Sequence, residues 1–306
     1  MLELRHLRML YEVARAGSFS GAARELGYTQ PAISQQMRAL ERAFGTPLVV
    51  REGRRVVFTE AGAELLRHAE DLLHRVTVAQ TTVAAVAGRH TGRVRLTVFP
   101  SGSATLVPPV AALVRSRHPA VSLSLAEGEP PDSLHTMRSG GCDVVLGFSY
   151  PEGRDEPEAS GLLRMPLMSD PLVALLPAGH HLAQRRVVHL AELAGEAWIG
   201  GCPRCRGHLV DACATAGFTP DITFATDDTL AVQGLVAAGL GVSVTPRLML
   251  AAACRPDVVA RPLEPAMHRS ISAFTWPDLV RVPTVRIVLD AFRDVTSAPI
   301  PTAQVC

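Results

Sequence analysis

Several features that are common in other proteins are absent from this chain of 306 residues. It has no lysine, so all thirty of its basic residues are arginine; such a bias can follow from genome composition alone and identifies no function. The most apolar stretch, residues 229–244, is too short and too rich in glycine to span a bilayer. The first ten residues are amphipathic and charged, without the apolar core of a signal peptide. We therefore expect a cytoplasmic protein with no membrane partner, in which the six cysteines stay mostly reduced.

The short motifs of common enzyme classes are absent as well. The sequence contains no GxSxG, HExxH or phosphate-binding loop, and GFSYP at residues 147–151 is only a near miss. GLG at residues 239–241 lacks the later glycine of a dinucleotide-binding fingerprint. His180 and His181 stand in what the sequence predicts to be a loop. We therefore expect no enzymatic activity.

What the chain does contain is typical of a folded protein with more than one domain. Its residues are 47% hydrophobic and 19% charged, and 306 residues can bury more than one core. The net charge is only +1, but residues 1–58 hold nine arginines against five glutamates. A basic N-terminal segment ahead of a neutral body is consistent with nucleic-acid binding.

Residues 4–44 show three amphipathic helical patterns in close succession. The first covers residues 4–15, and Ser18 is a suitable N-cap for the second, which ends at Gly27. The third begins near Gln30, with Pro31 in its first turn, where the missing N–H costs little. Its expected buried stripe is Ile33, Met37, Leu40 and Phe44. The second and third helices, separated by a short turn, predict a helix-turn-helix whose latter helix enters the major groove.

The face of the third helix opposite its buried stripe is polar. At about 100° per residue, this face carries Pro31, Ser34, Gln35, Arg38 and Arg42. Glutamine and serine can hydrogen-bond to base edges, and arginine can bind phosphate or guanine. Taken alone, the same face could equally be the solvated side of an ordinary helical bundle.

Residues 47–62 predict a hairpin followed by a helix. Two valine-rich runs flank Glu52 and Gly53, which favours a tight turn. Arg51, Arg54 and Arg55 gather at its tip, as in a basic wing placed against the sugar-phosphate backbone.

A long helical pattern then runs from Thr59, its expected cap, to about Gly88. Apolar residues recur in it every seven positions: Leu65 and Leu72, Leu66 and Leu73, and Ala69, Val76 and Val83. Such a repeat predicts packing against a second helix of the same kind. The alternative is a linker that packs only on its own chain. Residues 88–92 are expected to form a hinge.

Strand and helix patterns alternate beyond the hinge. Strands are expected at 93–99, 121–127, 142–148, 165–177, 198–201, 222–226, 241–246 and 269–276, and helices near 103–117, 131–139, 206–216, 228–239 and 283–295. This alternation predicts an α/β body with largely parallel sheets, large enough for two lobes with a cleft between them.

The front of the chain resembles the N-terminal domain of LysR-type transcriptional regulators. The matching residues are Ser18-Phe19, Ala22-Ala23, Leu26, Gln30-Pro31-Ala32-Ile33-Ser34, Leu40-Glu41, Gly45, Pro47-Leu48, Arg51 and Thr59-Glu60-Ala61-Gly62. The family usually has phenylalanine where this chain has Val50, a change that would repack the root of the hairpin. After residue 90 the resemblance is diffuse, and its best marker is AGLGVSVTP at residues 238–246.

The resemblance implies three parts: an all-α winged helix-turn-helix domain at residues 1–58, a dimerisation linker helix at 59–88, and an effector-binding domain at 89–306. The last would have a two-lobed, periplasmic-binding-protein-like α/β fold, with lobe I at about 93–164 and 267–306 and lobe II at about 165–266. The resemblance further implies a homo-oligomer, commonly a tetramer, that binds double-stranded promoter DNA and contacts RNA polymerase if it is an activator. The expected DNA-binding residues are Ser18, Thr29, Gln30, Pro31, Ser34, Gln35, Arg38, Arg51, Arg54 and Arg55.

A small effector is expected in the cleft between the lobes. Ser101, Gly102 and Ser103 lead from a strand into a helix, where hydroxyls and free N–H groups suit an anion, although they could equally be simple caps. The family's geometry adds Gly201, Cys202, Thr226, Asp227 and Thr245. Because Asp227 is unfavourable to an anion, we expect a neutral or cationic effector.

Three cysteines leave a second possibility open. Cys202, Cys205, His208 and Cys213 could supply four zinc ligands, or the cysteines could react with oxidants beside Arg204 and Arg206. Peroxide-sensing members of the family use two cysteines nine positions apart, whereas Cys213 follows Cys205 by eight positions and Cys202 by eleven. The spacing is also shorter than in usual zinc sites, and Cys213 could simply be buried on a helix.

The leading interpretation is a sequence-specific DNA-binding transcriptional regulator controlled by a small effector, with no resident cofactor. A thiol- or zinc-responsive regulator is the first alternative, and a solute-binding α/β protein with an accessory helical domain is the second. Residues 1–88 alone should dimerise and bind DNA under the leading interpretation, and should do neither under the second alternative.

Overall fold

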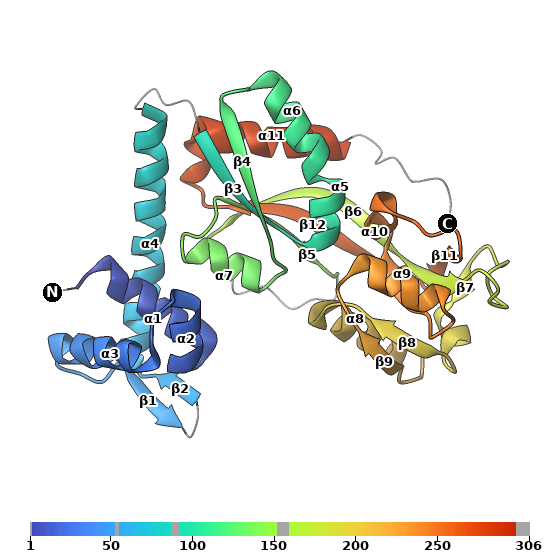
Figure 1. Cartoon of the computed structure of the whole chain (residues 1–306), viewed down its shortest axis with the longest axis horizontal. Helices are drawn as coiled ribbons and strands as arrows, with labels where there is room; N and C mark the ends of the chain where they lie inside the picture. The colour runs from blue at the N-terminus through green and yellow to red at the C-terminus, as the bar shows by residue number, and fades with distance from the viewer. Residues whose placement is uncertain (1, 53–54, 87–91, 152–158, 298–306) are drawn as a thin grey trace.

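The computed structural model describes residues 2–52, 55–86, 92–151 and 159–297. Figure 1 shows a small helical domain with a two-stranded hairpin, one long helix (α4), and a larger α/β domain beside it. The small domain holds α1 (Leu4–Ala16), α2 (Phe19–Leu26) and α3 (Gln30–Phe44). Its three helices agree with the three predicted ones.

Glycine ends each of these helices, as expected for Gly27. Gly17, Gly27 and Gly45 all have positive φ values, of 60°, 69° and 69°, which glycine adopts without a Cβ penalty. Ser18 caps α2 as predicted, because its Oγ accepts a hydrogen bond from the N–H of Gly21 at 3.1 Å.

One apolar core holds the three helices together. Ile33, Met37 and Leu40 are each at most 2% exposed and pack in a cluster with residues of α1 and α2. Phe44, expected on the same stripe, is 47% exposed, so that prediction is wrong. Phe44 is the last residue of α3 and lies outside the cluster, because the core ends one turn earlier than the pattern suggests.

The predicted hairpin consists of β1 (Val49–Glu52) and β2 (Arg55–Phe58), paired antiparallel. Thr59 joins it to α4, accepting a hydrogen bond from the N–H of Gly62 at 3.1 Å and donating to the carbonyl of Pro47 at 2.8 Å. A Cβ on Gly62 would lie 1.9 Å from the carbonyl oxygen of Leu48. Only glycine therefore lets α4 start this close to the hairpin.

Helix α4 (Glu60–Val86) has two different apolar faces. Leu65, Ala69 and Leu73 are buried in the core of the small domain, so part of the helix does pack on its own chain. Leu72 and Val83 are 41% and 67% exposed. These two residues leave an apolar face for a second helix, and dimerisation through it stays a prediction. Of the expected hinge, only Gly92 lies within the described residues.

The α/β domain is built on a mixed sheet, ordered β4-β3-β5-β12-β6-β11-β7, with β10 also paired to β6. Its strands are β3 (Gly92–Val98), β4 (Val121–Glu127), β5 (Val144–Ser149), β6 (Leu163–Pro177), β7 (Val188–His189), β10 (Ser243–Pro246), β11 (Val258–Glu264) and β12 (His268–Thr275). β3 runs parallel to β4 and β5, but β12 is antiparallel to β5 and β6, as are β10 and β11 to β6. The expectation of largely parallel sheets is therefore wrong. Strand β6 runs from one lobe into the other and β12 returns beside it, which alternating strand and helix patterns do not reveal.

Helices cover both lobes, and β8 (Ala197–Gly200) and β9 (Asp221–Ala225) form a separate parallel pair in lobe II. The helices are α5 (Pro100–Thr105), α6 (Val107–Arg117), α7 (Asp132–Arg138), α8 (Pro203–Thr215), α9 (Thr229–Ala237), α10 (Arg247–Ala252) and α11 (Pro283–Ser297). One apolar core surrounds Leu96, Phe148 and Phe292 in lobe I, and others surround Trp198 and Val236 in lobe II. The sequence patterns missed α10 and β11.

The helix expected at 103–117 is in fact two helices, α5 and α6, which meet at Leu106. Pro108 and Pro109 lack an N–H and would clash with the preceding turn of a continuous helix. Helix α5 also begins earlier than expected, at Pro100. Ser101, Gly102 and Ser103 therefore lie inside α5 and not in a loop before it.

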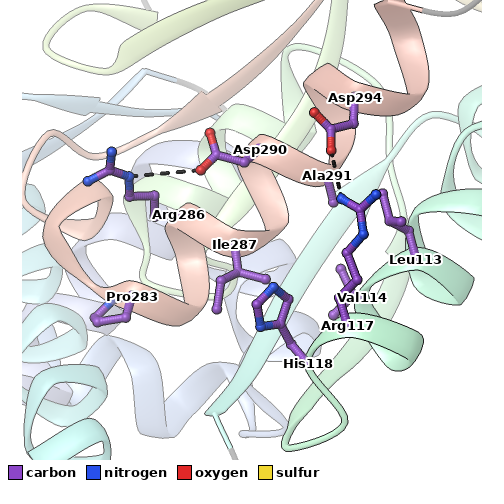
Figure 2. A pocket seen from close by; sticks show the side chains of 10 residues that line it. All are labelled: Leu113, Val114, Arg117, His118, Pro283, Arg286, Ile287, Asp290, Ala291 and Asp294. Atoms are coloured by element: carbon purple, nitrogen blue, oxygen red, sulfur yellow. Dashed lines mark hydrogen bonds and ion pairs between the residues drawn. The ribbon is translucent and has the colours of Figure 1, made fainter.

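Figure 2 shows a groove of about 390 Å³ between α6 and α11 on lobe I. Arg117 pairs with Asp294 at 3.1 Å across it, and Arg286 pairs with Asp290 at 3.8 Å. The groove contains none of the predicted site residues. Because these charges are paired with one another, the groove offers no obvious charge to a ligand.

Candidate DNA-binding surface and effector cleft

The outer face of α3 presents the predicted polar side chains to solvent. Gln35, Arg38 and Arg42 are exposed and line an open hollow of about 850 Å³. The Gln30 amide donates a hydrogen bond to Ser34 Oγ at 2.7 Å, which orders the first turn of this face. Glu41 lines this hollow too, and its Oε1 accepts the N–H groups of Leu48 and Val49 at 3.0 and 3.3 Å.

Two other carboxylates of the small domain, Glu12 and Glu25, are paired away from this face. Glu12 and Glu25 both pair with Arg15, each at 2.8 Å, which joins α1 to α2 and raises the pKa of Arg15. Within the described residues, neither Arg38 nor Arg42 has an ion-pair partner. Two exposed cations without an ion-pair partner among the described residues thus stand on the helix that the sequence assigns to DNA.

Two of the other predicted DNA-binding residues also have structural roles. Ser18 and Thr29 are N-caps, and Thr29 Oγ1 accepts the N–H of Ala32 at 3.4 Å. Arg55 is exposed on β2. Arg54 and the side chain of Arg51 lie outside the described residues.

Arg269 of β12 stands at the junction of the two lobes. Its Nε donates to Asp170 of β6 at 2.9 Å, and its Nη2 donates to Ser101 Oγ at 2.8 Å. Its guanidinium lies 4.8 and 4.7 Å from the ring centroids of Phe99 and Phe148. Arg269 and Asp170 are 2% and 1% exposed, so this ion pair is buried.

A cavity of about 50 Å³ opens beside Arg269 between the lobes. Six of the eight predicted effector residues line it: Ser101, Gly201, Cys202, Thr226, Asp227 and Thr245. Gly102 and Ser103 do not line it, because α5 begins at Pro100 and turns them away. The Ser101 hydroxyl already accepts a hydrogen bond from Arg269, which leaves its own proton to donate.

The cavity adjoins an outer hollow of about 380 Å³ whose wall is acidic. Its charged lining residues are Glu127, Glu129, Asp132, Asp227 and Arg204. Burial raises the pKa of Glu129, with Asp227 acting in the same direction and Arg269 and Arg204 opposing it.

Sequence reasoning missed Arg269, Asp170 and Glu129. One signal was available for Arg269, which is a lone charge at the start of a strand of small and apolar residues, RSISAF. A charge in a buried strand needs a partner. That its partner is Asp170 depends on the pairing of β12 with β6, which the sequence does not show.

Comparison with known protein families identifies the small helical domain and the α/β domain of this chain. Residues 4–63 match the bacterial regulatory helix-turn-helix protein model of the lysR family, and residues 87–297 match the LysR substrate binding domain. The chain belongs to the LysR family. It is a DNA-binding transcriptional regulator with an effector-binding domain.

Curated relatives and solved structures agree with this assignment to the LysR family. A probable hydrogen peroxide-inducible genes activator of Mycobacterium avium is 35% identical over 79% of this chain and 76% of its own length. The transcriptional dual regulator GltC of Bacillus subtilis is 30% identical over 88% of this chain and 89% of its own. A full-length OxyR variant from Pseudomonas aeruginosa has the same fold, with a TM-score of 0.64 at 20% identity over 100% of this chain and 99% of that one.

The four residues considered as zinc ligands do not converge in this LysR-family chain. Cys213 is 0% exposed in a core of lobe II, where burial raises its pKa to about 11. Cys202 and Cys205 face the cleft, and the His208 ring stacks on Tyr150 at 3.9 Å. In the described part of the chain, these four form no group with metal-ligand geometry.

His180, His181 and Glu196 do come close together on lobe II. The N–H of Leu182 points at His180 Nδ1 at 3.2 Å, and His180 Nε2 lies 3.1 Å from Glu196 Oε1. If Nδ1 is the acceptor, Nε2 carries the proton and donates it to Glu196. This geometry favours a hydrogen-bonded pair over a metal site.

The regulator's two domains touch directly through α7 of lobe I. The Tyr11 hydroxyl of α1 donates to the carbonyl of His135 at 2.5 Å, and Arg138 pairs with Glu70 of α4 at 2.7 Å. The His74 ring of α4 also stacks on Trp276 at 4.0 Å. Figure 1 shows α7 beside α4. These contacts join lobe I to the helix that carries the DNA-binding domain.

Replacing Arg138 with alanine is expected to loosen this contact. Arg138 and Glu70 are only 12% and 24% exposed, and hydrogen bonds to charged groups contribute about 1.5–3 kcal/mol. Amide hydrogen exchange around Glu70 should then be faster by roughly tenfold or more. Arg117→Ala is the control, because its pair with Asp294 is 62% and 55% exposed and joins α6 to α11, without a residue of α4 or α7. Equal exchange at Glu70 in both variants would show that the contact does not hold α4.

Proposed function

We propose that this regulator reads promoter DNA with α3 in the major groove and with the β1–β2 wing on the backbone. The observation that carries the proposal is the exposed face of Gln35, Arg38 and Arg42, whose positive charge the described carboxylates leave unpaired. Glutamine suits base edges and arginine suits guanine or phosphate. The other predicted DNA-binding residues would position the helix on the duplex. They are Ser18, Thr29, Gln30, Pro31, Ser34, Arg51, Arg54 and Arg55.

We infer that the active form is a homodimer or a tetramer of such dimers. The exposed Leu72 and Val83 on α4 supply an apolar stripe that a second α4 would cover. Two copies of α3 would then meet two half-sites at a fixed spacing. Such a regulator works beside the DNA in the cytoplasm, has no enzymatic activity, and contacts RNA polymerase where it activates.

The effector that fits the cleft is a small neutral or cationic molecule. Arg269, the buried cation of the cleft, is neutralised by Asp170 and does not offer a free charge to an anion. The outer hollow holds four carboxylates and one guanidinium. A bound molecule with an amine or hydroxyl group would meet Glu129 and Asp227, and closure of the lobes around it would move α7 against α4.

A thermal-shift scan of small metabolites tests the cleft. A molecule at 100 times its Kd stabilises a folded protein by about 2.7 kcal/mol. Ser101→Ala should reduce that shift, because Ser101 lines the cavity and accepts from Arg269. Ser103→Ala, on the same helix but outside the cavity lining, should leave it unchanged. Equal shifts in both variants would place the effector elsewhere.

A further inference from the structure

A carboxylate of α3 holds the root of the β1–β2 wing. The Oε1 atom of Glu41 accepts the N–H groups of both Leu48 and Val49, at 3.0 and 3.3 Å. Val49 is the first residue of β1, so these two bonds reach the point where the wing begins. Among the described residues, no other group of α3 is hydrogen-bonded to residues 46–58.

The wing has other attachments, which go to other parts of the small domain. The carbonyl of Leu48 accepts the N–H of Thr59, just before α4, at 3.0 Å. The N–H of Val56 donates to the carbonyl of Gly17, between α1 and α2, also at 3.0 Å. Leu48 is 1% exposed and belongs to the apolar core of the domain. The wing therefore stays joined to the domain without Glu41, whose two bonds set its place relative to α3.

A second role for Glu41 has to be weighed against this one. Glu41 lines the same open hollow as Arg38 and Arg42, so its carboxylate could act only as a countercharge to them. Among the described residues, however, neither arginine forms an ion pair with it. One of its oxygens instead accepts from two backbone donors, and hydrogen bonds to a carboxylate are roughly twice as strong as those between neutral groups. The geometry therefore favours a role in holding the wing.

We propose that Glu41 is a positioning residue for DNA binding, which fixes the wing relative to the outer face of α3 so that both meet one duplex. The inference rests on the proposed function and deepens it. Because β1 and β2 are paired from Val49 to Glu52, a shift at Val49 is carried to Arg55 near the tip. A phosphate-binding group that is held in place before binding loses less freedom on binding, and the complex is tighter.

The two roles of Glu41 predict opposite effects on DNA affinity. If the carboxylate acts only through its charge, its removal takes a negative charge away from the phosphates and tightens binding. If it positions the wing, its removal weakens binding, although the protein becomes more positive. The sign of the change in affinity therefore separates the two roles.

Amide hydrogen exchange of the full chain tests whether Glu41 holds the wing. In Glu41→Ala, exchange at Leu48 and Val49 should be faster by roughly tenfold or more, because both N–H groups lose a charged acceptor. Exchange at Met37 and Leu40, in the core of α3, should stay unchanged. Glu41→Gln keeps an acceptor oxygen but no charge, so exchange at the same two N–H groups should be faster by a smaller factor.

Gel-shift titration measures the effect on DNA, with a duplex that the unmodified chain selects and with random duplex. Glu41→Ala should weaken both by roughly tenfold, because the wing must then be ordered on binding. Their ratio should change little, since Gln35 is intact. Glu41→Gln should lose less affinity than Glu41→Ala. Glu25→Ala is the control for charge: it removes a carboxylate of α2, leaves Arg15 paired with Glu12 at 2.8 Å, and should not weaken binding.

Unchanged exchange at Leu48 and Val49, or DNA binding by Glu41→Ala that is as tight as that of the unmodified chain or tighter, overturns the inference. If the alanine variant unfolds, which faster exchange at Met37 and Leu40 would reveal, Glu41→Gln decides by the same two criteria. An unmodified chain that binds no duplex overturns the proposed function instead, while hydrogen exchange still shows whether Glu41 holds the wing.

Discussion

Replacing Arg269 with alanine is expected to lower the free energy of unfolding of the effector-binding domain by about 3–5 kcal/mol. The variant leaves Asp170, which is 1% exposed, as a buried carboxylate without its cation. Among the described residues, only Leu248 would still donate to it, through its N–H at 2.9 Å. The variant also removes the cation from between the rings of Phe99 and Phe148.

This loss should depend on pH. Burial already raises the pKa of Asp170 although Arg269 opposes the shift, and the pKa rises further when Arg269 is removed. The uncompensated charge exists only above that raised pKa. The deficit of the variant should therefore be largest at neutral pH and shrink as the pH falls through the raised pKa and Asp170 becomes protonated.

Denaturant unfolding followed by tryptophan fluorescence measures the loss selectively. The two tryptophans of the chain, Trp198 and Trp276, both lie in the effector-binding domain. The control is Arg255→Ala, because the pair of Arg255 with Asp257 is 49% and 46% exposed. Such surface pairs contribute about 0–1 kcal/mol, and a loss that small in Arg269→Ala would contradict a buried pair at the lobe junction.

Replacing Gln35 with alanine should reduce discrimination between specific and random duplex by about 1–3 kcal/mol, or roughly 5- to 150-fold. Gln35 is exposed on the outer face of α3 and is expected to hydrogen-bond to base edges. Its loss removes base contacts but no charge. Affinity for random DNA, which depends on phosphate contacts, should therefore change little.

Arg42→Ala is the matched variant from the same helix face. It should weaken specific and random binding alike and reduce the salt slope of the affinity by about one. Gel-shift titrations at several salt concentrations measure both variants. If Gln35→Ala loses affinity equally for both duplexes, the side chain contacts phosphate, and α3 is not the base-reading element.

The helical front of the chain could be predicted because its signals are local. The spacing of Ile33, Met37 and Leu40, the cap at Ser18 and the stop at Gly27 each act within a few residues. Phe44 was misplaced because a helical period does not show where the neighbouring helices end. The mixed sheet was missed for a similar reason, since the return of β12 beside β6 joins residues about one hundred positions apart.

The cleft shows the same division between local and distant signals. The resemblance to the family, and not a local signal, placed Gly201, Cys202, Thr226 and Thr245 in the cleft, and all four line one cavity. The shift of Gly102 and Ser103 out of the lining follows from where α5 starts, with Pro100 as its first residue. Arg269 could have been suspected from its buried strand, but its bonds to Asp170 and Ser101 depend on three elements meeting in space.

Selection of bound duplexes from a random double-stranded library, using the full chain, tests the central claim most directly. Two copies of α3 held by paired subunits should enrich one motif with two symmetry-related half-sites. The centres of the half-sites should lie one helical turn of DNA, about 10 base pairs, or a multiple of that distance apart. The same selection with Gln35→Ala should enrich that motif less. No enriched motif, or an identical motif at equal enrichment in the variant, would contradict the reading of DNA by α3.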